Sequence, residues 1–173
     1  MVIYFGKKYD LSHIKSLECN DNVINCVDTF KLLGVFFNRD LTWSHHVDFI
    51  LKKAAKRIYF IYLLVKSGLK SSDVVSVYCS VIRSVLEYAS PVWHPGLTIA
   101  QSKLIEGVQK RCLKIIFPEL DYNDALFISG LQKLSVRRNI ATRDLFKEIK
   151  HPDHVLHDLL IANRGLLFLN VLA

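Results

Sequence analysis

The segment FKLLGVFFNRDLTWSHHVDFILKKAAKRIYFIYLL, residues 30–64, changes its hydrophobic period in the middle. Aromatic and aliphatic side chains from Phe30 to Phe37 favour a β-strand. From Ser44 onward apolar residues recur every three or four positions, which is the spacing of one face of an α-helix. The segment therefore predicts a strand that leads into a long basic helix.

The predicted helix has an apolar face and, opposite it, a face on which cations and aromatic rings are mixed. At about 100° per residue, Phe49 and Phe60 fall among the lysines on the outward side. The predicted apolar face consists of Val47, Ile50, Leu51, Ala54, Ile58, Ile61, Tyr62 and Val65. The lysines of the outward face are Lys52, Lys53 and Lys56. Such a mixture is typical of a groove that follows a nucleic-acid backbone, and it is equally typical of a helix that packs on another helix.

The flanking sequence extends this pattern in both directions. Upstream, strands are predicted at Val2–Phe5, Ile14–Leu17 and Val23–Val27, with Cys19–Asn22 as a turn. Downstream, helices are predicted at 44–66, 71–88, 98–117, 121–128 and 135–150, closed by Gly68, Pro91 and Pro118 where these end an element. The expected fold is mainly α, in the α+β class: a small N-terminal antiparallel β-sheet followed by a bundle of four to five helices. The expected divisions are 1–40, 41–150 and a weakly structured tail at 151–173.

Composition limits the partners. The chain has 173 residues, 51% of them hydrophobic, and a formal net charge of +7, so we expect one core and acidic partners such as RNA, DNA or a hybrid of the two. The sequence has no apolar run long enough to cross a bilayer and no secretory signal, so we expect no membrane partner and a cytoplasmic or nuclear location. The four cysteines lack zinc-site spacing and are expected to be reduced thiols.

The sequence shows no group of residues with the spacing of a catalytic or metal-binding site. The carboxylates are scattered, no glycine-rich phosphate loop occurs, and His151, His154 and His157 offer at most two ligands on a regular face. We therefore expect no catalytic residue, no metal, no cofactor and no small-molecule substrate.

A second basic face is predicted on the helix near 98–117. Lys103, Lys110 and Lys114 align on one side, and Gly107 between them is expected to permit close approach of a partner. The predicted apolar side of this helix consists of Leu104, Ile105, Val108, Cys112 and Ile115. If the two basic helices pack side by side, their lysines could form one cradle for a duplex backbone.

Four segments resemble the region after the catalytic palm in reverse transcriptases of non-LTR retrotransposons, the LINE and jockey-like group. The segments are FKLLGVFFNRDLTWSHHV (30–47), KKAAKRIYFIYLL (52–64), VYCSVIRSVLEYASPVWHP (77–95) and LIEGVQKRCLKIIFP (104–118). The resemblance covers about residues 1–150. Its most distinctive residues are Glu87, Tyr88, Pro91, Trp93, Gln109, Lys110 and Arg111.

This resemblance implies a binding role. Phe30, Lys31, Leu32, Leu33 and Gly34 resemble the family's primer-grip motif. Residues 1–40 would then be the edge of the palm, and residues 41–150 the thumb and connector, which hold template and primer. The family's polymerase chemistry needs an aromatic-x-Asp-Asp motif for two metal ions, and this sequence contains no Asp-Asp pair.

Two other interpretations remain open for the same residues. The segment 30–69 is also similar to a short amino-terminal module of AlkB-homologue-8-type tRNA-modifying proteins, although the sequence lacks the oxygenase's iron-binding pattern and a methyltransferase loop. The third interpretation is a helical protein-interaction domain that binds a partner helix through Phe49 and Phe60. Salt dependence separates it from nucleic-acid binding.

The missing aspartates give a first prediction. Purified protein supplied with primer, template, Mg²⁺ and nucleotides should extend no primer, because no pair of adjacent carboxylates is present to hold the two metal ions. A gel-based primer-extension assay measures this, with an active reverse transcriptase as the positive control. Incorporation above the protein-free blank would contradict the prediction.

Overall fold

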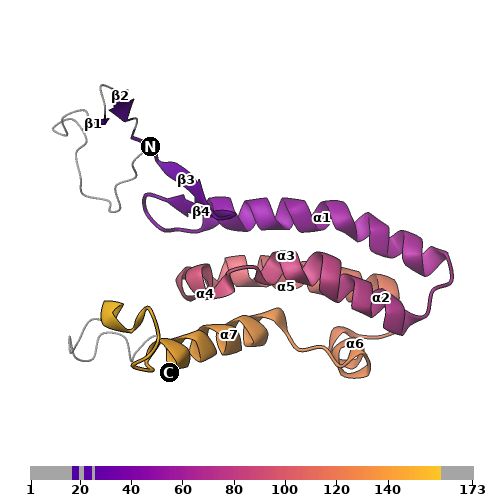
Figure 1. Ribbon diagram of the computed structural model, residues 1–173. Helices are drawn as coiled ribbons and strands as arrows, with labels where there is room; N and C mark the ends of the chain where they lie inside the picture. Colours follow the sequence, from indigo (N-terminus) through magenta and orange to yellow (C-terminus); the bar gives the residue numbers. More distant parts are fainter. Residues whose placement is uncertain (1–16, 20–21, 25, 161–173) are drawn as a thin grey trace.

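The computed structural model describes residues 17–19, 22–24 and 26–160, and it is mainly helical (Figure 1). Two β-hairpins precede a series of helices, which confirms the predicted fold class. The strand predicted at Val2–Phe5 lies outside the described residues, as does most of the strand predicted at Ile14–Leu17. Cys26, Cys79 and Cys112 are free thiols, as expected.

Among the described residues, the β-structure consists of two separate antiparallel hairpins. Strand β1 (Leu17–Cys19) pairs with β2 (Asn22–Ile24), and β3 (Thr29–Leu32) pairs with β4 (Val35–Asn38). The prediction of one continuous strand from Phe30 to Phe37 is therefore wrong.

The reversal between β3 and β4 occurs at Leu33 and Gly34, whose φ angles are 45° and 86°. Two-residue hairpin turns of type I′ require positive φ at both central residues, and glycine adopts it without steric cost. The turn places Phe30 opposite Phe37 in the register. Val35 of the second strand is only 4% exposed and belongs to the helical core.

The helices lie close to their predicted positions. Helix α1 covers Ser44–Lys66, α5 covers Ile99–Ile116, α6 covers Tyr122–Ser129, and α7 covers Leu134–Ile149. The helix predicted at 71–88 is a continuous run of α2 (Ser71–Tyr78), a π-helical turn η2 (Cys79–Arg83) and α3 (Ser84–Glu87). Short turns follow as α4 (Ser90–Trp93), η3 (His94–Gly96) and, near the end of the described chain, η4 (His157–Leu159).

Local sequence explains several helix ends. Thr98 and Gln101 form a capping box at the start of α5, and the Asp121 carboxylate accepts from the Asp124 N–H at the start of α6. Gly130 ends α6 in the left-handed conformation. Helix α2 has no side-chain cap, because its N-cap is Lys70, whose side chain makes no capping bond.

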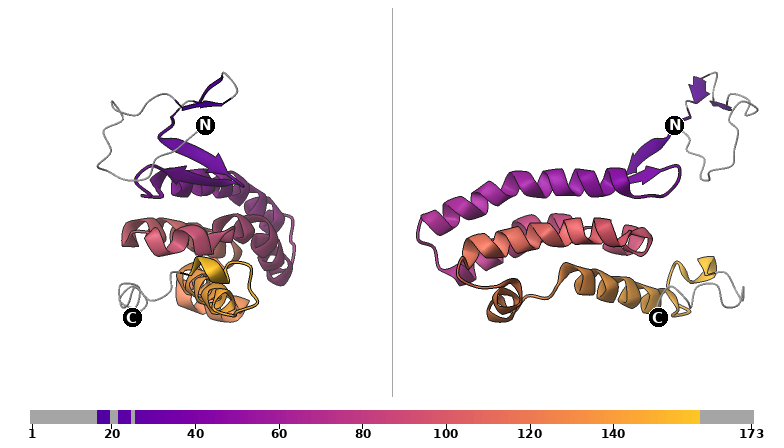
Figure 2. Two further views of the ribbon diagram at one scale, coloured as in Figure 1. Left: turned by 60° about the vertical axis from the view of Figure 1, so that its left-hand side comes forward. Right: turned by 180° about the vertical axis from the view of Figure 1, so that it is seen from behind.

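The helices pack in three layers. Helix α1 forms one outer layer, α2, α3 and α5 lie in the middle, and α6 and α7 form the other outer layer (Figure 1), an order that Figure 2 shows from two further sides. Helix α1 packs along α5 and also contacts α2 and α3. Its buried side chains are His46, Val47, Ile50, Ala54, Ile58 and Ile61. Most of the predicted apolar face is thus confirmed, but Tyr62 is 48% exposed.

The junction of α1 with η3 leaves no space for a side chain at Gly96. A Cβ atom there would lie 2.4 Å from Trp43 Nε1 and 2.8 Å from Trp43 Cδ1. Trp43 is 6% exposed, and its ring makes an edge contact with Phe37 at 5.5 Å between centroids, so it has little room to move. Gly107 on α5 has no described atom within 4 Å of such a Cβ, so it faces open space.

These two glycines give a matched test of the packing. Gly96→Ala should lower the free energy of unfolding by about 1–3 kcal/mol, because the methyl group overlaps the buried Trp43 ring. Gly107→Ala should raise it by about 0.5–1 kcal/mol, because alanine favours a helix interior and meets no obstacle. Urea denaturation followed by circular dichroism measures both values. Equal effects of the two substitutions would contradict this packing.

Candidate nucleic-acid interface

The primer-grip-like residues occupy β3 and its turn. Phe30 is half-buried, whereas Lys31, Leu32 and Leu33 are exposed, Leu33 by 82%. Gly34 lies in the turn, where its backbone passes close to the ring of Tyr88. The motif therefore presents one cation and two aliphatic side chains to solvent.

Lys31 and Lys53 converge on one aromatic ring. The Lys31 Nζ atom lies 5.0 Å from the centroid of Phe49 and 5.3 Å from that of Phe36, and the Lys53 Nζ atom lies 6.0 Å from the Phe49 centroid. These distances are within the range of cation–π attraction. Both lysines border a pocket of about 380 Å³, hereafter the hairpin pocket. It is lined by Lys31, Gly34, His46, Phe49, Ile50, Lys53, Ser84, Val85 and Tyr88, a set with two lysines and no carboxylate.

Contacts between distant parts of the chain hold the hairpin over α1 and α3. The Tyr88 hydroxyl donates to the Leu33 carbonyl at 2.9 Å, across 55 positions of sequence. Phe36 and Phe49 make an edge contact at 5.0 Å between centroids. The hairpin is thus attached to the helices on two sides of the pocket, through Tyr88 on one side and through Phe49 on the other.

The outcome for the two phenylalanines is mixed. Phe49 is half-buried against the hairpin and packs on the core, so its predicted outward position is wrong. Phe60 is 48% exposed, as predicted. Phe49 is not on the outward side because the β3–β4 hairpin folds back over the first turns of α1 and covers its ring.

The remaining lysines of α1 face outward beside two tyrosines. Lys52 and Lys56 are exposed, and Tyr59 and Tyr62 stack at 6.3 Å between centroids with a 26° interplanar angle. Tyr59 is 65% exposed. This tyrosine pair was not predicted from the sequence. Its spacing of three residues on a predicted helix is the signal that indicates such a contact.

The lysines of α5 border two pockets that are also lined by residues of α6 or of the start of α7. Lys103 and Lys110 border a pocket of about 470 Å³ together with Lys133, and Lys110 and Lys114 border a smaller one of about 250 Å³. Helices α1 and α5 do pack together, but Lys53 of α1 and the three α5 lysines line different pockets. Leu104, expected on the apolar side of α5, is 57% exposed. Gly107, expected to permit close approach, has room for a Cβ atom, because no described atom beyond its own stretch of helix backbone would lie within 4 Å of it.

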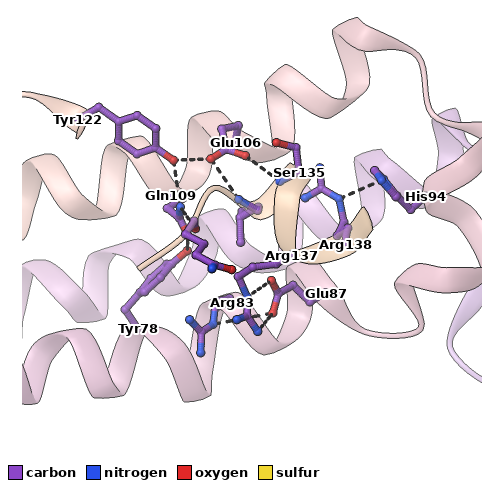
Figure 3. A network of polar contacts seen from close by, with 12 residues as sticks. Tyr78, Arg83, Glu87, His94, Glu106, Gln109, Tyr122, Ser135, Arg137 and Arg138 are labelled. Carbon is purple, nitrogen blue, oxygen red and sulfur yellow. Dashed lines mark hydrogen bonds and ion pairs between the residues drawn. The ribbon is translucent and has the colours of Figure 1, made fainter. Parts of the chain in front are cut away.

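Several residues that carry the family resemblance serve the interior. Glu87 accepts two hydrogen bonds from Arg137, at 2.7 and 3.1 Å, and lies 3.8 Å from Arg83 (Figure 3). The Glu87 carboxylate thereby raises the pKa of Arg137. Trp93 is fully buried, and its indole N–H donates to the Tyr88 carbonyl at 2.9 Å.

Gln109 joins three elements inside the protein. Its side-chain oxygen accepts from the buried Tyr78 hydroxyl at 2.7 Å, and its amide nitrogen donates to Tyr122 Oη at 2.9 Å and to the Gln132 carbonyl at 3.1 Å. Burial raises the pKa of Tyr78 well above its usual value, so this hydroxyl stays protonated as a donor. Figure 3 shows this network continuing through Tyr122 to Glu106.

The described part of the chain offers no metal centre. Among these residues there is no group of three or more His, Cys, Asp or Glu side chains that could hold a metal ion. None of the helices in the described ranges is long and apolar enough to cross a membrane. Comparison of the chain with protein-family profiles, with curated proteins and with solved structures finds no match.

His46 at the back of the hairpin pocket links stability to pH. Its side chain is fully buried, and its Nδ1 atom accepts from the Phe36 N–H at 3.4 Å. Burial, assisted by neighbouring His45, lowers the pKa of His46 to about 4. The folded state therefore favours neutral imidazole. Its contribution is complete above the unfolded pKa of about 6.5 and is lost as the pH falls from there toward 4.

We predict that His46→Gln flattens the dependence of stability on pH between 6.5 and 4. The loss for the unchanged protein over this window should reach about 3 kcal/mol at most from His46, with a further share from His94, whose pKa burial also lowers. Urea unfolding at a series of pH values measures the slope. The exposed neighbour provides the control, because His45→Gln leaves the burial of His46, which is the larger cause, in place and should keep most of the slope. An unchanged slope in His46→Gln would contradict the assignment.

Proposed function

We propose that this chain is a template–primer binding part of an RNA-directed DNA polymerase of the non-LTR retrotransposon type, and that it grips the sugar–phosphate backbone at the hairpin pocket. Lys31 and Lys53 would each contact a phosphate, and the rings of Phe49 and Tyr88 would form the floor and side. The proposal gives the chain a binding role and assigns no catalytic role to its residues.

The observation that carries the proposal is the convergence of Lys31 and Lys53 on Phe49 in a pocket whose lining includes no carboxylate. Two cations at 5.0 and 6.0 Å from one ring centroid border the same pocket, so a polyanion bound there would be attracted by both. Two independent features of the sequence led to these lysines. Lys31 belongs to the primer-grip-like motif, and Lys53 belongs to the basic face of α1.

The outer face of α1 supports an extended contact. Lys52 and Lys56 are followed on the same side by Tyr59, which stacks with Tyr62. Exposed rings next to cations suit a nucleic-acid strand, because bases and sugars pack on the rings while phosphates approach the ammonium groups.

A protein-interaction domain is the second candidate. The observation that favours it is the row of exposed apolar side chains on α1, which includes Tyr59, Phe60, Tyr62 and Leu63 at 40–65% exposure. A partner helix could cover this row. Binding of that kind depends weakly on salt, since it buries apolar surface and releases few counterions.

We predict that a labelled RNA–DNA hybrid duplex binds with a log Kd that rises with log salt at a slope of about 1.8, because two phosphate contacts each contribute roughly 0.9. Lys31→Gln should weaken binding about threefold to tenfold near 0.1 M salt and reduce the slope by about one contact. Lys53→Gln should act alike. Fluorescence anisotropy over a salt series measures both quantities.

The matched control is Lys70→Gln. Lys70 is exposed before α2, away from the hairpin pocket, and its loss removes the same charge. Equal weakening by Lys31→Gln and Lys70→Gln would reduce the interaction to general attraction by the positive net charge and would refute the proposed grip. Binding that ignores salt would favour the protein-interaction domain.

A further inference from the structure

A second group of lysines borders a pocket between α5, α6 and the start of α7. Lys103 and Lys110 of α5 and Lys133, the N-cap of α7, border the pocket of about 470 Å³, hereafter the α5–α7 pocket. Ser102, Ser135 and Tyr122 lie in its wall. None of the three lysines takes part in an ion pair among the described residues.

The one carboxylate in the wall is already engaged by the protein. Glu106 accepts from the Tyr122 hydroxyl and from the backbone N–H groups of Leu134 and Ser135, each of the latter at 3.2 Å (Figure 3). It thus satisfies the free N–H groups at the start of α7, a position that favours negative charge. Burial together with the bond to Glu106 raises the pKa of Tyr122. Glu106 is therefore directed toward α7 and Tyr122 instead of pairing with the lysines.

A buried arginine, Arg138, contacts the pocket wall from the protein interior through Ser102. Arg138 is 0% exposed, and its Nη2 atom donates to Ser102 Oγ at 3.1 Å. Its Nε atom lies 3.5 Å from His94 Nδ1, and its guanidinium carbon lies 5.8 Å from the centroid of Trp93. Arginine keeps its charge even though burial lowers the pKa of Arg138. No carboxylate contacts this guanidinium among the described residues, and its Nη1 atom has no hydrogen-bond partner there.

A buried cation is costly unless negative charge lies near it. Glu106 and Glu87 already stabilise the charge of Arg138 from beyond ion-pair distance, and a further negative charge in the pocket would add to this effect. Ser102 joins Arg138 to the pocket, because its oxygen accepts from the guanidinium and its own O–H stays available to donate into the pocket. Ser135 lies one helical turn before Arg138 and adds a second hydroxyl to the wall. The pocket thus offers three ammonium groups and two hydroxyls, with a fixed positive charge behind them.

We propose that the α5–α7 pocket binds a phosphate group. Three lysines suit a group that carries more than one negative charge and several acceptor oxygens, which distinguishes phosphate from a single carboxylate. The proposal does not depend on the hairpin pocket. The phosphate could belong to a nucleic-acid backbone or to a free phosphate ester, and the same chemistry would recognise both.

The probe for this site is pyrophosphate, titrated into the protein by isothermal calorimetry at constant ionic strength. The protein should bind it, and the double substitution Lys110→Gln with Lys133→Gln should weaken binding at least tenfold. Both side chains are exposed, so the variant should fold. The control removes the same charge elsewhere: Lys66→Gln with Lys70→Gln should change the Kd less than twofold. Absence of pyrophosphate binding, or equal weakening by the two double variants, would overturn the proposal.

Titration of the RNA–DNA hybrid duplex with the same variants identifies the source of the phosphate. Weaker duplex binding by Lys110→Gln with Lys133→Gln supports a backbone phosphate, and unchanged duplex binding together with weaker pyrophosphate binding supports a free phosphate ester. Duplex binding by Lys31→Gln tests the proposed grip independently, because this substitution leaves the α5–α7 pocket intact. The grip and the phosphate site can therefore fail separately.

Discussion

Burial of one stripe of α1 is the constraint on which the rest of the structure depends. Val47, Ile50, Ala54, Ile58 and Ile61 are at most 5% exposed and face α5 and the α2–α3 helix. Because successive residues on a helix are separated by about 100°, fixing this stripe also fixes the direction of every other side chain on α1. Phe49 and Lys53 then meet the hairpin, while Lys52, Lys56 and Tyr59 face solvent.

The second constraint is the polar interior on the opposite side of the middle layer. Gln109 satisfies two tyrosines and a carbonyl, and Glu106 satisfies the start of α7. Buried polar groups stabilise a fold only when they are paired, so these contacts restrict how α6 and α7 can sit on α5. Glu106 is bonded to Tyr122 and to the start of α7, and it forms no ion pair with Lys103 or Lys110 within the described ranges. In the proposed phosphate site, α5 would thus carry both structural and binding residues.

The residues that resemble the non-LTR reverse transcriptases fall into both groups. Glu87, Trp93 and Gln109 support the interior, whereas Lys31 and Lys110 reach the surface beside pockets. The proposed grip and the proposed phosphate site both rest on cations that border these two pockets. The exposed row on α1 remains the feature that a protein partner would use.

The sequence by itself determined the positions of the five predicted helices to within a few residues and which stripe of α1 is buried, because periodicity and caps such as Thr98 and Gly130 act within a few residues. It also indicated the basic faces. Only the tertiary structure decided that the strand from Phe30 turns back at Gly34, that Phe49 is covered and Tyr62 is not, and that Lys133 and Arg138 join the lysines of α5. These outcomes depend on contacts such as the Tyr88 hydroxyl with the Leu33 carbonyl, 55 positions apart. Local spacing cannot encode a contact at that separation, since it forms only when the packed helices bring both partners together.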